Sequence, residues 1–164
     1  MEKLDIKRQS FLNLTFSTDW FFVSAIRSLL KEILNKHYKN IESVSVIIIC
    51  ISELIENSIK YSDNGKAHVS IDFDFENGLV MCQLTNTANE ENIKSLKDET
   101  KDLNINNIQE VYIKRVERAA ESSDEDKSQL GLARVVFDGQ TNLDIAFNDN
   151  QVIVRTVFSI AKIE

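Results

Sequence analysis

The dipeptide Asn77-Gly78 constrains the fold of this chain more than any other feature of its sequence. Asn-Gly is the strongest short signal for a two-residue turn between antiparallel strands. Folding the chain about this turn places three pairs of apolar residues on one face: Phe75 with Val80, Phe73 with Cys82, and Ile71 with Leu84. The sequence therefore predicts a hairpin with one buried face.

Other apolar patterns predict the elements around this hairpin. A second hairpin is expected about Asp149-Asn150, with Phe147 opposite Val152 and Ile145 opposite Val154. Alternation over 10–17 predicts a strand. Helical spacing predicts four helices, over about 19–38, 42–62, 107–120 and 130–137. Because one-sided sheets need a cover, we expect an α+β fold: a two-layer α/β sandwich whose mixed, mainly antiparallel sheet is covered on one face by helices.

Composition narrows the class of protein. At 164 residues the chain is expected to form a single domain over 1–164. A net charge of −7 argues against a nucleic-acid partner. The longest apolar run, 46–51, is too short to span a membrane, and the first residues do not resemble a signal peptide. Cys50 and Cys82 lie in apolar patterns without metal or redox spacing, so we expect reduced core cysteines in a cytoplasmic protein.

The second long helix carries the polar residues with the clearest chemistry. Glu53 and Asn57 are four residues apart and share a helix face, and Lys60 continues that stripe. A carboxylate can activate a nucleophile, a carboxamide oxygen can bind magnesium, and an ammonium can contact phosphate. The alternative is a solvated face on which Glu56 and Lys60 form an ordinary ion pair one turn apart.

The stretch Glu53-x-x-x-Asn57-x-x-Lys60-Tyr61-Ser62, in this order of elements, resembles the N box of the GHKL ATPase family. That family includes gyrase, histidine-kinase catalytic domains and anti-sigma-factor serine kinases, and its fold is the Bergerat fold. The resemblance implies a site for ATP and magnesium. It also implies that Glu53 is the general base, Asn57 the magnesium ligand and Lys60 a phosphate contact.

A second segment, 128–134, resembles the later glycine box of the family. By this resemblance Gly131 and Leu132 would hold the phosphates at the start of a helix, with Lys127 offsetting the acidic run before it. The first glycine box, Asp-x-Gly-x-Gly, is missing from 84–91. Asn86 would be a neutral substitute for the aspartate that binds adenine, at a cost of about 1–3 kcal/mol.

Two functions follow from this resemblance, and an unrelated α/β sandwich remains as a third reading. The first is an ATP-binding regulatory domain of the histidine-kinase or anti-sigma type, acting as a serine protein kinase in a partner-switching pathway. The second is a degenerate domain of the same fold that binds a partner protein without hydrolysis or transfer. The expected partner is an anti-sigma antagonist or another signalling protein, and the sequence leaves a homodimer open.

Overall fold

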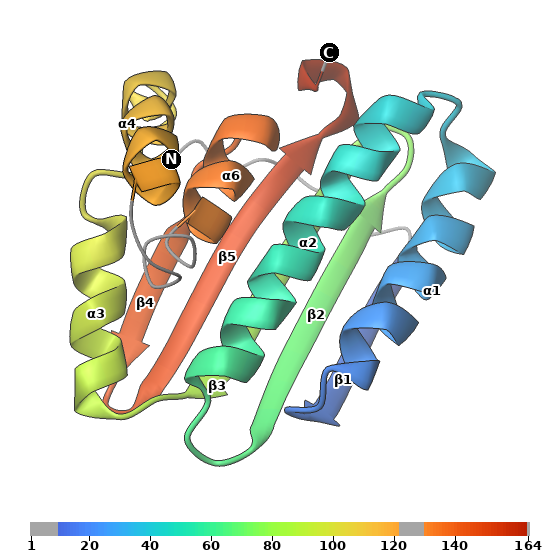
Figure 1. The fold of residues 1–164 in the computed structure, drawn as a ribbon. Helices are drawn as coiled ribbons and strands as arrows, with labels where there is room; N and C mark the ends of the chain where they lie inside the picture. The colour runs from blue at the N-terminus through green and yellow to red at the C-terminus, as the bar shows by residue number, and fades with distance from the viewer. Residues whose placement is uncertain (1–9, 122–129, 164) are drawn as a thin grey trace.

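The protein is described by a computed structural model, which covers residues 10–121 and 130–163. Five strands form one open sheet in the order β1-β2-β3-β5-β4 (Figure 1). Their bounds are β1 Ser10–Ser17, β2 Lys66–Asp74, β3 Leu79–Thr87, β4 Asp144–Asn148 and β5 Gln151–Ser159. All four strand pairs are antiparallel, so the parallel component of the expected mixed sheet is absent from the described residues.

The helices lie on one side of this sheet (Figure 1). Their bounds are α1 Phe21–His37, α2 Ile41–Tyr61, α3 Glu90–Thr100, α4 Ile108–Glu121 and α6 Leu130–Asp138, followed by a short 3-10 turn, Ile160–Lys162. The α+β expectation is confirmed: the fold is a two-layer sandwich of one sheet and one helical layer. In the described residues, no helix is both long enough and apolar enough to cross a membrane.

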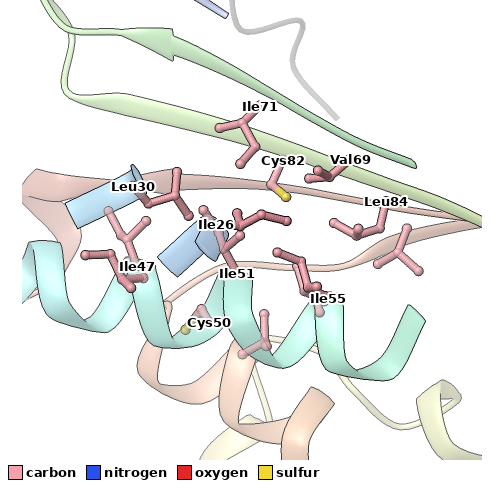
Figure 2. Packing of buried hydrophobic residues seen from close by; sticks show 14 of the residues in the cluster. Ile26, Leu30, Ile47, Cys50, Ile51, Ile55, Val69, Ile71, Cys82 and Leu84 are labelled. Atoms are coloured by element: carbon pink, nitrogen blue, oxygen red, sulfur yellow. The ribbon is translucent and has the colours of Figure 1, made fainter. Parts of the chain in front are cut away.

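The core lies between α1, α2 and the inner face of the sheet (Figure 2). The labelled side chains come from both layers: Ile26 and Leu30 of α1, Ile47, Cys50, Ile51 and Ile55 of α2, and Val69, Ile71, Cys82 and Leu84 of the sheet. Both cysteines are buried and reduced, as predicted. Because the apolar stripe of α2 is held against the sheet, the orientation of its polar residues is fixed.

The first hairpin forms where it was predicted, but its predicted register is wrong by two residues. Ile71 lies opposite Cys82 and Phe73 opposite Val80, and 75–78 form a four-residue turn. The Asp74 carboxylate accepts hydrogen bonds from the main-chain N–H of Asn77 at 3.1 Å and from its side chain at 2.8 Å. These bonds close the longer turn, and a shift of two residues keeps the same side chains on the buried face.

The second hairpin has the predicted register, with Phe147 opposite Val152 and Ile145 opposite Val154. The predicted helices and the first strand are also found, within a few residues of their predicted bounds. The helix α2 begins after Asn40, whose side chain accepts a hydrogen bond from the N–H of Ser43 at 3.0 Å. The sequence did not single out α3, a mostly polar helix in which Leu96 is the buried residue.

Candidate functional site

Glu53 and Asn57 lie on the side of α2 that faces α6. Because the apolar side of α2 packs on the sheet, Glu53 and Asn57 lie on a side of the helix that faces the neighbouring helix, and both are half-buried. The N-terminal turn of α6 lies directly against them, with Gly131 as the point of closest approach. The structure therefore brings the two predicted boxes together, although they are far apart in the sequence.

Gly131 permits this approach because it has no side chain. A Cβ atom at this position would lie 2.7 Å from Glu53 Oε2 and 3.5 Å from Asn57 Nδ2. The Glu53 carboxylate thus occupies the space beside the first turn of α6, where main-chain N–H groups favour an anion. The close packing of α6 against Glu53 therefore requires glycine at position 131, a contact that the sequence analysis did not predict.

Arg134 is a member of the site to which the sequence analysis assigned no role. Its Nη1 donates to Glu53 Oε1 at 2.9 Å, and the side chains are 38% and 22% exposed for Arg134 and Glu53. A hydrogen bond with Tyr112 of α4 raises the pKa of the Arg134 guanidinium, and Glu53 raises it further. A signal was available, because Arg134 is three residues after Gly131 and so shares its helix face.

Two more carboxylates lie beside this ion pair. Burial raises the pKa of Glu56, Glu53 raises it further, and Arg27 and Arg134 oppose the change. Glu56 Oε1 forms an ion pair with Arg27 at 3.4 Å. The ion pair between Glu56 and Lys60, which their spacing on the helix had suggested, is therefore not the one that forms. Burial also raises the pKa of Asp138, and Arg134 opposes it. The positive charge of Arg134 therefore lies near three acids, Glu53, Glu56 and Asp138.

Asn57 is an unsatisfied polar group in this site. Its Nδ2 atom is buried and has no hydrogen-bond partner in the described part of the chain. Rotation of the amide would present the oxygen to the same place, because the two ends of a carboxamide have similar shapes. An orphaned buried amide next to a carboxylate fits a magnesium ion completed by phosphate and water oxygens. Among the described residues, no group of three histidine, cysteine or acidic side chains forms a metal cage.

Asn57, Asn86 and Leu132 line one small cavity beneath the site. Its volume is about 30 Å³, enough for a water molecule but too little for an adenine ring. Asn92 and Leu96 of α3 cover one side of it, and most of its wall is apolar. The cavity beside Asn57 and Asn86 can therefore hold a water molecule but not the base of a nucleotide.

The other predicted contacts have different outcomes. Lys60 is exposed, and its Nζ lies 5.0 Å from the centre of the neighbouring Tyr61 ring. Burial raises the pKa of Glu99 on α3, and the charge of Lys60 is one of those that oppose this change, so Lys60 lies near that helix. Asn86 is 8% exposed and donates from Nδ2 to the carbonyl of Thr87 at 3.3 Å. Lys127 lies outside the described residues.

Comparison with known proteins identifies a similar fold. No family model matches the chain, and no curated protein matches it. Among solved structures, it is similar to a chain of the SiaB-SiaC complex from Pseudomonas aeruginosa, with a TM-score of 0.66 and 13% sequence identity. That similarity covers 90% of this chain and 88% of the other. At this identity the likeness concerns the fold.

Proposed function

We propose that this chain is a signalling regulator of the GHKL type that binds Mg-ATP between α2 and α6. The observation that carries the proposal is the close packing of Glu53, Asn57 and Gly131, which joins the two sequence boxes at one place. The buried, unpaired Nδ2 of Asn57 supports a missing ligand there. The similar chain belongs to a complex of two proteins, which supports a protein partner for this chain as well.

In this proposal each side chain has one role. Asn57 would hold magnesium through its amide oxygen, and the first turn of α6 would face the phosphates. Bound Mg-ATP supplies a transferable phosphoryl group. Glu53 would accept the proton of a serine hydroxyl on the partner protein, which makes the chain a serine protein kinase. Because Arg134 donates to Oε1, the proton would be accepted by Oε2, or by Oε1 after Arg134 has moved away.

A second function is favoured by two observations on the same site. The Arg134–Glu53 ion pair uses the proposed base, and the adjoining cavity of about 30 Å³ has no room for adenine. A chain that stayed in this conformation would bind its partner through the same fold without hydrolysis or transfer. The two functions differ in ATP hydrolysis and phosphoryl transfer, and binding of magnesium and ATP is the first step that can separate them.

Calorimetry with ATP and magnesium tests the proposal. Wild-type protein is expected to bind ATP only with magnesium, and Asn57→Ala is expected to weaken binding by at least about tenfold through loss of a metal ligand. Asn35→Ala is the matched control, because Asn35 is exposed on α1. Glu53→Gln should retain ATP while slowing its hydrolysis, since the amide cannot accept the proton.

The outcomes separate the two functions. Failure of the wild-type protein to bind millimolar ATP would leave the interaction module as the function of this fold. Binding that Asn57→Ala and Asn35→Ala change equally would show that the nucleotide site is not between α2 and α6. Urea unfolding of each variant is measured in parallel, so that a loss of binding is compared only among folded proteins.

A further inference from the structure

The strand β4 forms one edge of the sheet. Half of its main-chain N–H and C=O groups point away from β5, its neighbour in the sheet. A two-residue connection at 149–150 makes Asn148 and Gln151 the first pair of the β4–β5 ladder. In such hairpins the residues flanking the turn exchange hydrogen bonds, and every second residue after them does the same. The main-chain N–H and C=O groups of Ile145 and Phe147 therefore point away from β5, toward the open edge.

The same two residues line a groove between β4 and α3. Its volume is about 370 Å³, much more than the cavity beside Asn57. Four half-buried apolar side chains, those of Leu103, Leu143, Ile145 and Phe147, line the groove. Lys97, Thr100 and the exposed Asp144 line it as well, so its surface is mixed and more polar than apolar. An occupant could thus bury apolar side chains in the groove while its main chain pairs with β4.

The rim of this groove on α3 is basic, although the chain as a whole has a net charge of −7. Lys97 lines the groove, and its Nζ lies 4.8 Å from the centre of the Phe147 ring. Lys94 and Lys101 are three and four residues away, so they lie along the same side of the helix. All three lysines are exposed. In the part of the chain that the structure describes, this arrangement places positive charge beside the outer edge of β4 and the apolar side chains of the groove.

We propose that the groove takes an extended acidic segment of a partner protein, which adds to the sheet as a sixth strand beside β4. An extended segment is favoured because a helix cannot satisfy the outward main-chain groups of Ile145 and Phe147. An acidic segment is favoured by the lysine rim. A second copy of this chain is disfavoured, because pairing β4 with itself would bring two lysine rims together. No described residue lines both this groove and the cavity beside Asn57, although α3 borders both of them.

Selection from a random peptide library against the full chain tests the proposal without naming the partner. The selected peptides are expected to be acidic, rich in β-branched residues, and to bind with a Kd of about 100 μM or tighter. Lys97→Glu should weaken their binding by at least about tenfold, since it reverses the charge at the rim. Lys36→Glu on α1 is the matched control, as Lys36 is equally exposed and far along the sheet from β4.

Hydrogen exchange then shows how the peptide binds. A sixth strand should protect the amides of Ile145 and Phe147 and leave that of Ala146 unchanged, because Ala146 already pairs with β5. Ile145→Pro should also abolish binding, because proline removes an outward N–H that the β4–β5 ladder does not use. The proposal is wrong if no peptide is enriched, if the peptides bind Lys97→Glu equally well, or if the two amides stay unprotected. Protection without peptide in a dimer would assign the groove to a second copy instead.

Discussion

The guanidinium of Arg134 lies 2.9 Å from Glu53 and joins α6 to α2 at the residue that we propose as the base. Tyr112 of α4 lies close enough to this guanidinium to raise its pKa, and its ring stacks on Phe137 of α6, with ring centres 4.7 Å apart. Three helices thus meet at one ion pair. A movement of α4 would act on Glu53 through Arg134.

Replacing Arg134 by methionine should increase ATP hydrolysis if the site is active. The variant removes the cation that holds Glu53 Oε1, so both oxygens of the carboxylate can accept a proton and the side chain can turn toward a substrate. We expect a severalfold rise in Mg-dependent hydrolysis, measured as phosphate release. Since both side chains are partly exposed, the loss of unfolding free energy should be only about 0.5–1 kcal/mol.

The double variant Arg134→Met, Glu53→Gln provides the control for that measurement. Hydrolysis that depends on the freed carboxylate should return to the wild-type level or below. A fall in hydrolysis in Arg134→Met alone would show that the guanidinium orients Glu53 rather than restraining it.

Gly131→Ala should disturb the site more than the fold. The added Cβ would meet the end of a flexible side chain, Glu53 Oε2, which can move aside. Alanine also has the higher helix propensity, by up to about 1 kcal/mol, so the unfolding free energy should change by less than that amount. The displaced carboxylate should no longer reach Arg134, and ATP binding should weaken by about tenfold. Chemical shifts of the Arg134 side chain and calorimetry measure these two effects.

Gly139→Ala should have the opposite outcome, a loss of stability. Its Cβ would collide with the main-chain carbonyl of Val135 and would lie 2.8 Å from a ring carbon of Phe158, which is fully buried. Neither group can move without disturbing the core, so the expected cost is about 1–3 kcal/mol. Urea unfolding of the two glycine variants side by side checks the contrast. Equal stability would show that α6 can shift at its C-terminal end.

Most of the fold could be predicted because its apolar periods are unambiguous. The face of each strand follows from alternation alone, so the core residues of the first hairpin were identified despite the wrong register. The register itself depends on the hydrogen bonds that the Asp74 carboxylate accepts from Asn77. The turn propensity of Asn-Gly does not predict these bonds. The helix α3 was missed because Leu96 is the buried residue of a mostly polar segment, too little for an apolar stripe.

The candidate site was predictable only in part. Family resemblance placed Glu53, Asn57 and Gly131 in one site, and in the structure these three residues pack together. The role of Arg134 depends on which helix faces α2, and that follows from the three-dimensional packing. The closed cavity could not be inferred either, because it depends on how α3 lies over Asn57 and Asn86.

Glu99→Gln should reduce the pH dependence of stability. Burial raises the pKa of Glu99 from 4.5 to about 7, with Arg115 and Lys60 opposing and Asp102 adding to the change. The folded state therefore binds this proton more tightly than the unfolded state, so stability should fall as the pH rises from about 4.5 to about 7 and then level off. Glutamine keeps the shape without a charge, and should raise the unfolding free energy at pH 8 by about 1–3 kcal/mol while changing it little at pH 4. Urea unfolding at both pH values measures this, and Glu90→Gln, exposed on the same helix, is the control. An equal effect of the two substitutions would show that Glu99 titrates as a surface carboxyl.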